Sequence, residues 1–220
     1  MGLWMSWSSG KDSAYALSIL LQDPKIKVSG IFTSINEKYR RVSMHSTAEE
    51  LLILQAERLN LPLEVVALPA VCSNELYKEK MMELILKAKK ADVDSIGFGD
   101  LLLEDIKQYR IKMMEGTNIK PLFPIFGNDT TELAKKLINQ KFKAVINSID
   151  EKKLSKELLG SEYNQNFINR LPEGVDHCGE NGEFHTFVYS APIFSNPINI
   201  KVGQIVSKDG YGYIDLLLDN

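Results

Sequence analysis

The sequence has little of several features that would define a class of function. It contains two cysteines, Cys72 and Cys178, which are too few for a disulfide framework or a four-cysteine zinc site. No run of apolar residues is longer than four, as in residues 51–54, so we expect no transmembrane helix. The first residues show no basic segment followed by an apolar block. We therefore expect no secretory signal and a cytoplasmic location.

An excess of basic charge is also missing. Residues 1–126 contain 16 basic and 16 acidic side chains, and residues 127–220 contain 10 and 13. Proteins whose main role is to bind nucleic-acid phosphates normally show a basic excess, so we do not expect a nucleic-acid partner. The rest of the composition, with 44% hydrophobic and 25% charged residues, is typical of a globular protein with a buried core.

The first part of the chain alternates between short apolar segments and longer amphipathic segments. We predict strands over residues 2–7, 28–35, 63–68 and 95–98, and helices over residues 11–22, 46–60, 73–91 and 104–115. In the second of these helices Thr47 and Glu50 have the spacing of a capping box. This alternation predicts an α/β fold with a parallel, Rossmann-like sheet that has helices on both faces.

The second part of the chain has a different pattern. Pro121, Pro124 and Gly127 interrupt the alternation, so we predict a first domain over residues 1–126 and a second over residues 127–220. The second domain is smaller and has an α+β pattern. It contains one predicted helix over residues 130–140 and predicted strands over residues 144–147, 183–189, 199–206 and 211–218.

A polar segment directly follows the first predicted strand and opens the first predicted helix: Ser8-Ser9-Gly10-Lys11-Asp12-Ser13. Small residues let a ligand approach the backbone closely, and free N–H groups at a helix start favour an anion. Lys11 adds a positive charge, and the serines add hydroxyl donors. Asp12 either holds a metal ion or caps the helix. The alternative is a plain turn with an N-cap.

A second group of polar residues lies within seven positions near the end of the chain: Glu180, Asn181, Glu183, His185 and Thr186. Such a cluster can bind an ammonium ion, orient ammonia or accept a proton during amide formation. On a strand that begins near Glu183, His185 would share its face and Thr186 would point away. The alternative is a solvated turn that leads into an edge strand.

These motifs resemble those of a known superfamily. Residues 8–13 are similar to the PP-loop of the ATP pyrophosphatases, usually Ser-Gly-Gly-Lys-Asp-Ser, with Ser9 where glycine is usual. Members cleave ATP between the α and β phosphates and adenylate a substrate oxygen, which a nitrogen or sulfur nucleophile then displaces. The resemblance implies a fold of the adenine nucleotide alpha hydrolase (HUP) type, with ATP and Mg²⁺ as cofactors.

Further blocks narrow the resemblance to the diphthine–ammonia ligase (diphthamide synthase domain) family. They are residues 97–100 with Glu104, Asp105 and Arg110, then residues 120–124, 171–176 and 178–187. The similarity extends from Trp4 to Phe194. Where archaeal and eukaryotic ligases have Glu-Gly-Gly-Glu-(Tyr/Phe)-Glu-Thr, this chain has Asn181 and His185, and it resembles the bacterial branch. The resemblance implies a ligase that adenylates a carboxylate, releases pyrophosphate and AMP, and forms an amide with ammonia.

The expected site residues combine this resemblance with the chemistry of the side chains. ATP is expected at Ser8, Ser9, Gly10, Lys11, Asp12, Ser13, Thr33, His45, Gly99 and Asp100, and Mg²⁺ at Asp12 and Asp100. Catalytic roles are expected for Lys11, Glu180, Glu183 and His185. Substrate contacts are expected at Glu104, Arg110, Asn181 and Thr186. The alternative for Asp100 and Glu104 is that they cap a helix, and the alternative for His45 and Arg110 is that they are ordinary surface residues.

The expected partners are ATP, ammonia and a carboxylate acceptor, which is either a small molecule or a protein side chain; a membrane partner is not expected. The identity of the acceptor and the oligomeric state stay open, with a homodimer as one option. Two alternatives for the function also stay open. One is a PP-loop enzyme that acts on another small molecule or on tRNA, and the other is a non-catalytic ATP-binding protein.

Overall fold

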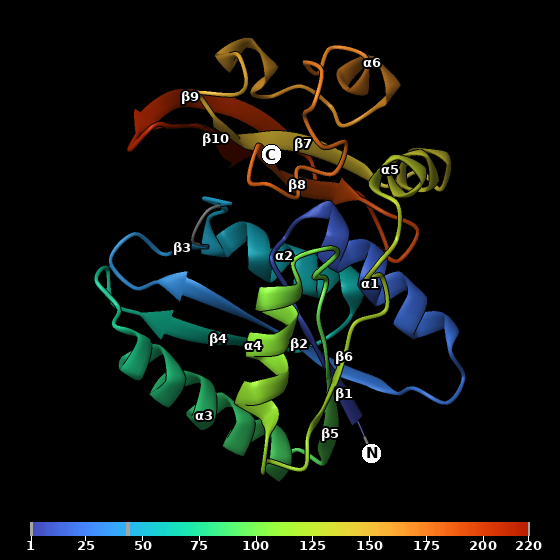
Figure 1. The fold of residues 1–220 in the computed structure, drawn as a ribbon, viewed down its shortest axis with the longest axis vertical. Helices are drawn as coiled ribbons and strands as arrows, with labels where there is room; N and C mark the ends of the chain where they lie inside the picture. Colours follow the sequence, from blue (N-terminus) through green and yellow to red (C-terminus); the bar gives the residue numbers. More distant parts are fainter. Residues whose placement is uncertain (1, 43–44, 220) are drawn as a thin grey trace.

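Two β-sheets, with helices between them and around them, make up the chain (Figure 1). The computed structural model describes residues 2–42 and 45–219. No helix in this described part combines the length and the apolar composition that crossing a bilayer would require.

The first sheet has six strands, with β1 at its centre. The strands are β1 (Gly2–Ser6), β2 (Val28–Asn36), β3 (Arg41–Val42), β4 (Leu63–Leu68), β5 (Val93–Gly97) and β6 (Lys120–Leu122). On one side β1 pairs in parallel with β2, which pairs with β4, and on the other side it pairs with β5, which pairs with β6. The short strand β3 is antiparallel to the end of β2. The order of the strands therefore reverses at β1.

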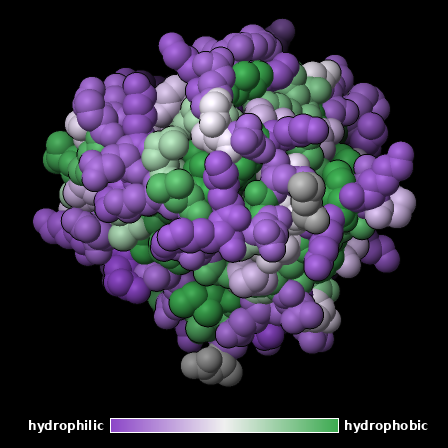
Figure 2. Space-filling model, turned by 90° about the horizontal axis from the view of Figure 1, so that it is seen from below, coloured by the Kyte–Doolittle hydropathy of each residue, from purple (hydrophilic) through white to green (hydrophobic). Residues whose placement is uncertain are grey.

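Helices cover both faces of this sheet, as the sequence predicts. They are α1 (Lys11–Gln22), α2 (Glu49–Leu59), α3 (Asn74–Lys90) and α4 (Glu104–Met114). Buried residues of α3 and α4 form one hydrophobic core with the sheet, whereas those of α1 and α2 belong to a different core. The end of the molecule away from the second sheet is covered mainly by hydrophilic side chains, with hydrophobic ones in scattered groups (Figure 2).

The second sheet has four antiparallel strands in the order β8-β7-β10-β9. The elements of this part are α5 (Thr130–Asn139), β7 (Lys143–Asp150), a 3-10 turn (Lys156–Leu158), α6 (Gln165–Ile168), β8 (Phe184–Ser190), β9 (Ile200–Lys208) and β10 (Tyr211–Leu218). The predicted fold class, a Rossmann-like sheet with a smaller α+β part, is confirmed.

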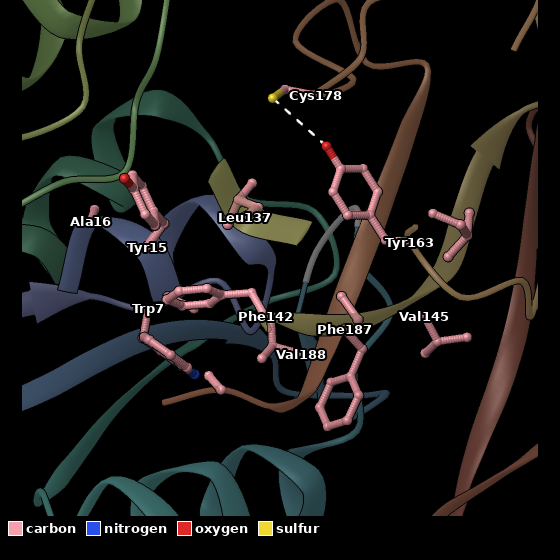
Figure 3. Close-up of a cluster of buried hydrophobic side chains, with 14 of the residues drawn as sticks. Trp7, Tyr15, Ala16, Leu137, Phe142, Val145, Tyr163, Cys178, Phe187 and Val188 are labelled. Atoms are coloured by element: carbon pink, nitrogen blue, oxygen red, sulfur yellow. Dashed lines mark hydrogen bonds between the residues drawn. The ribbon is translucent and has the colours of Figure 1, made fainter. Parts of the chain in front are cut away.

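One core joins the two sheets. Trp7, which follows β1, belongs to the same buried cluster as Phe142, Phe187 and Val188 of the second part (Figure 3). Helices α1 and α2 lie between the two sheets, and buried side chains of both helices belong to this cluster (Figure 1). The domain boundary between residues 126 and 127 stays a prediction, since packing is continuous across it.

The structure corrects several predicted elements. Helix α2 begins at Glu49, and its N-cap is Ala48, which makes no side-chain hydrogen bond. Thr47, the predicted cap, instead bonds through its hydroxyl to Ser9. The strands β3 and β6 and the short helix α6 were not predicted, because each has four residues or fewer. Pro121 lies within β6, which is consistent with the position of that strand at the edge of the sheet.

Candidate active site

A cavity of about 660 Å³ opens beyond the carboxyl ends of β1 and β5. The strand order reverses between these two neighbours, and open α/β sheets bind ligands at such a switch point. Both parts of the chain supply walls. The first part contributes residues between 6 and 13, His45 and residues between 98 and 110, and the second part contributes residues between 178 and 186.

The segment 8–13, called the phosphate loop below, has a strained residue at its centre. The φ angle of Ser9 is 73°, in the left-handed region that favours glycine. This is the position at which the PP-loop usually has glycine. The Ser9 side chain is buried, and its Oγ lies 2.7 Å from Oγ1 of Thr47. The serine therefore costs backbone strain and gains a hydrogen bond to the segment that precedes α2.

Gly10 allows the loop to contact the second sheet closely. A Cβ atom at this position would lie 2.8 Å from Cε1 of His45 and 3.1 Å from the carbonyl oxygen of Thr186. The Lys11 N–H donates to Oγ1 of Thr186 at 3.1 Å, while Gly10, the N-cap residue of α1, has no side-chain cap. Thr186 thus caps α1 from the other sheet. Asp12 and Ser13, the next residues of α1, line the cavity, and a helix start of this kind favours an anion.

The ammonium group of Lys11 is buried at the wall of the cavity. Its Nζ donates to both carboxylate oxygens of Asp12, at 2.9 and 3.0 Å, and to the carbonyl of Cys178. It also lies 5.4 Å from the ring centres of Tyr163 and Phe184. Burial, the largest effect, lowers the pKa of Lys11, but the neighbouring acidic groups, Asp12 first and then Cys178 and Glu180, together outweigh it, so the pKa is raised overall. The residue therefore stays charged and fixed in place.

Asp100 and Arg110, two further cavity-lining residues of the first part of the chain, form an ion pair. Oδ2 of Asp100 lies 3.5 Å from Nε of Arg110, and neither atom has a hydrogen-bond partner among the described residues. Burial raises the pKa of Asp100, and Arg110 opposes the shift. Gly99 brings this pair against the phosphate loop, because a Cβ there would lie 2.9 Å from the Ser13 nitrogen.

Glu180 is the carboxylate of the second part that lines the cavity. Its Oε2 accepts the Leu102 N–H at 3.2 Å. Burial and then the Asp12 carboxylate raise its pKa to about 7, against the opposing charge of Lys11. Near neutral pH this group is therefore present in both protonation states, as a residue that transfers protons should be.

Glu183 has a different environment from Glu180, although both belong to the predicted cluster. It does not line the cavity, and its buried carboxylate accepts the backbone N–H of Asn181 at 2.9 Å and the side-chain amide of Asn181 at 3.0 Å. The predicted shared face with His185 is wrong. Because β8 begins at Phe184, Glu183 lies in the preceding turn, where the alternation of a strand does not apply.

His45 and His185 lie side by side, with ring centres 4.6 Å apart. Nδ1 of His45 lies 3.2 Å from the Thr186 carbonyl, which can only accept, so Nδ1 carries the hydrogen and Nε2 is an acceptor. Burial lowers the pKa of His45 to about 4, and burial also lowers that of His185 well below its ordinary value. The Nε2 atom of His185 is buried and lacks a partner within residues 2–42 and 45–219. Two neutral imidazoles thus form one end of the wall.

The structure brings most of the expected residues together around one cavity. Those that line it are Ser8, Lys11, Asp12, Ser13, His45, Gly99, Asp100, Arg110, Glu180, Asn181, His185 and Thr186. Ser9 and Gly10 shape the loop without lining the cavity. Thr33 is buried in β2, and Glu104 is exposed and accepts a hydrogen bond from Gln108 of its own helix, so neither is a lining residue.

Sequence reasoning missed the apolar part of the wall. Phe98, Leu103 and Ile106 line the cavity beside Arg110, whose guanidinium lies 4.9 Å from the Phe98 ring centre. Cys178 also contributes, chiefly through the carbonyl that accepts from Lys11. Apolar residues carry no motif that distinguishes a cavity wall from a core. The one sequence signal was the spacing of Ile106 and Arg110, because residues four apart on a helix lie on the same face.

The expected Mg²⁺ site can be tested against the side chains present. Within the described ranges, no group of three His, Cys, Asp or Glu residues could hold a metal ion. Mg²⁺ that binds together with a nucleotide needs only one or two protein carboxylates, because phosphates and water supply the remaining ligands. Asp12 and Asp100 line the same cavity, and Oδ2 of Asp100 has no hydrogen-bond partner in that part of the chain. These two carboxylates fit such a shared site.

Comparison with known proteins gives two family matches, one for each part of the chain. The diphthamide synthase N-terminal domain matches residues 1–121, and the diphthamide synthase C-terminal domain matches residues 129–217. Diphthine–ammonia ligase from Mus musculus is 25% identical over 244 aligned positions, which cover 96% of this chain and 87% of that protein.

Two further relatives align over shorter stretches. Diphthine–ammonia ligase from Bos taurus is 26% identical over 139 positions, which cover 59% of this chain and 51% of that protein. The protein of the same name from Homo sapiens is 26% identical over 151 positions, which cover 63% and 55%. The alignments with these two proteins span about half of their length.

Proposed function

The chain belongs to the diphthamide synthase family, and from this premise we propose that it is an ATP-dependent ligase that forms an amide from a carboxylate and ammonia. The observation that carries the proposal is that one cavity joins the phosphate loop to Glu180 and His185. A nucleotide anchored at the loop and an acceptor held by the second part would therefore meet in one space.

The first step of the proposed reaction uses the phosphate loop. A carboxylate oxygen of the acceptor attacks the α-phosphorus of ATP, the bond between that phosphorus and the bridging oxygen to the β-phosphate breaks, and pyrophosphate leaves. We assign phosphate binding to the start of α1 and to Ser8 and Ser13, which line the cavity. The fixed charge of Lys11 stabilises the negative charge that builds up on the pyrophosphate.

The second step uses the wall contributed by residues 178–186. Ammonia attacks the carbonyl carbon of the acyl adenylate, the bond from that carbon to the AMP oxygen breaks, and the amide and AMP are released. We assign to Glu180 the removal of a proton from ammonium, since its pKa of about 7 places it between the two protonation states. The neutral imidazoles of His45 and His185 would accept N–H groups of ammonia and leave its lone pair for the attack.

The remaining residues receive supporting roles in this proposal. Asp12 and Asp100 would hold Mg²⁺, which when bound neutralises charge on the phosphates. Arg110 and Asn181 line the cavity and are assigned to the acceptor. We assign Thr186 and Glu183 to positioning, because their polar atoms bond to Lys11 and Asn181. Thr33 and Glu104 receive no role, since neither lines the cavity.

The acceptor is proposed only as a carboxylate. The relatives are named diphthine–ammonia ligases, which makes diphthine the first compound to test. Asn181 and His185 stand where the archaeal and eukaryotic pattern has glycine and glutamate. A glutamate would supply a negative charge for a cationic acceptor, whereas the pKa of His185 keeps this imidazole neutral. Other carboxylates should therefore be tested alongside diphthine.

Product analysis tests the proposed reaction. The chain is incubated with ATP, Mg²⁺, ammonium and a panel of carboxylates that includes diphthine, and the nucleotide products are separated. AMP and pyrophosphate, formed only with a particular carboxylate, are expected. ADP and phosphate would contradict the mechanism, and ATP binding without turnover for every carboxylate would favour the non-catalytic alternative.

A further inference from the structure

A glutamine outside the cavity bonds to the phosphate loop from behind. Gln55 lies on α2, and its side chain is completely buried between the two sheets. Its Oε1 accepts the indole N–H of Trp7 at 2.8 Å. Its Nε2 donates to the carbonyl of Ser9 at 3.1 Å and to the carbonyl of Val188 at 2.7 Å. One side chain thus joins the residue that follows β1, the loop and β8.

The contact at Ser9 is the important one, because Ser9 is the strained residue of the loop. Its carbonyl accepts from two directions, from the N–H of Val188 at 2.9 Å and from Nε2 of Gln55 at 3.1 Å. A non-glycine residue keeps a left-handed conformation only when its surroundings fix it. These two donors, with Thr47 at the Ser9 hydroxyl, provide that constraint.

We infer that Gln55 is a positioning residue for nucleotide binding, which holds Ser9 in its left-handed conformation so that the N–H groups that follow point at the phosphates. The inference rests on the proposed function, since it concerns ATP binding at the same loop. Gln55 does not line the cavity, so it would act through Ser9. A purely structural role would instead make it one more buried amide with satisfied hydrogen bonds.

The two ends of the Gln55 amide can be tested separately in the full chain. Gln55→Glu keeps an acceptor for Trp7 and removes both donors, so the Kd for ATP with Mg²⁺, measured by calorimetry, should rise about tenfold or more. Trp7→Phe removes the bond at the other end and also disturbs the buried core. This variant should melt at a lower temperature while its Kd for ATP stays within about twofold of the original.

A second ligand separates positioning from general destabilisation. The loop is assigned to the pyrophosphate portion, so Gln55→Glu should weaken ATP and pyrophosphate binding and leave AMP binding nearly unchanged. An equal loss for AMP and ATP would overturn the inference, and so would an ATP affinity no weaker than that of Trp7→Phe. If the buried charge prevents folding, Gln55→Met, which is uncharged and of similar length, is measured against the same criteria.

Failure of this inference can be distinguished from failure of the proposed function. If the unaltered chain binds no ATP, the proposed function is wrong, and the inference falls with it. If the unaltered chain binds ATP and both Gln55 variants bind it equally tightly, only the positioning role is wrong.

Discussion

The two faces of the first sheet are covered in different ways. On one face, α3 and α4 close a core whose members, among the residues that the structure describes, all come from the first part of the chain. On the other face, the core of α1 and α2 continues into the four-stranded sheet. The second face therefore also determines the shape of the phosphate loop, through Gln55, Thr47 and Thr186. Packing on the α1–α2 face thus sets the geometry of the phosphate loop, whereas the α3–α4 core contains Phe98, whose ring packs beside Arg110 at the cavity wall.

The largest effect is expected at Glu180, on the wall that extends the α1–α2 face. Glu180→Gln should lower the rate of amide formation by about 10²–10⁴-fold, because a general base is lost. At a constant concentration of free ammonia, the original protein should gain activity as pH rises through about 7, where Glu180 ionises, and the variant should lose this dependence. Steady-state rates between pH 5 and 9 check this, with Glu104→Gln as the exposed control that should change nothing.

Glu180→Gln, which should lower activity, should raise the stability of the folded chain above neutral pH. Folding raises the pKa of Glu180 from 4.5 to about 7, so the folded chain holds a proton that the unfolded chain releases over this range. Its contribution to stability falls as pH rises from 4.5 to about 7. Glu180→Gln should therefore melt at a higher temperature than the original protein at pH 8. A lower melting temperature at pH 8 would show that burial does not disfavour the charge.

A pair of core substitutions tests the comparison of the two faces directly. Leu84→Ala on α3 and Leu17→Ala on α1 each remove a buried side chain, and each should cost about 2–5 kcal/mol of unfolding free energy. Only Leu17→Ala should also weaken ATP binding, because α1 carries the phosphate loop. Urea denaturation and calorimetry measure the two quantities. An equal loss of ATP affinity in both variants would remove the distinction between the faces.

A side chain added at Gly10 of the phosphate loop should cost less stability than the two core substitutions, but it should weaken ATP binding specifically. Gly10→Ala places a Cβ 2.8 Å from His45 and 3.1 Å from the Thr186 carbonyl, and the Kd for ATP should rise about a hundredfold. Gly30→Ala is a matched control, since its Cβ would lie 3.0 Å from Nε1 of Trp4, in β1 and outside the cavity lining. If both variants bind ATP equally, close contact between loop and second sheet is not required.

The smallest effect is expected at Glu183. Glu183→Ala leaves the Asn181 N–H without its acceptor and should cost about 1–3 kcal/mol. Glu183→Gln keeps an acceptor oxygen, so it should recover most of that stability and most of the activity. Thermal unfolding and rates with both variants separate positioning from catalysis. A Glu183→Gln variant as inactive as Glu180→Gln would return Glu183 to the catalytic group.

The repeating parts of the fold could be predicted because their signals are local. The alternation of apolar segments and amphipathic helices identified the strands of the parallel sheet, and α1 begins and ends at the predicted residues. The start of α2 was wrong because the Thr47 hydroxyl bonds to Ser9, a partner that lies 38 positions away in the sequence. Local spacing contains no information about such a partner.

The site could be predicted in outline but not in its assignments. The residue types around the cavity follow from the motifs, yet Glu180 and Glu183 carry the same signal in the sequence. What separates them is a turn that directs one carboxylate toward Leu102 and the other toward Asn181. Gln55 was missed, because a glutamine in an amphipathic helix normally lies on the solvated face, and only the second sheet buries it.

The cap that Thr186 places on α1 also has a consequence for biosynthesis. The bond from the Lys11 N–H to Thr186 joins residues 175 positions apart, and one of the two donors to the Ser9 carbonyl, the N–H of Val188, is still further along. A nascent chain that has completed all six strands of the first sheet still lacks these groups. The phosphate loop is thus completed only after β8 has left the ribosome and paired. Contacts of such long separation form late in folding, so this loop, although synthesised before β8, is among the last segments to mature.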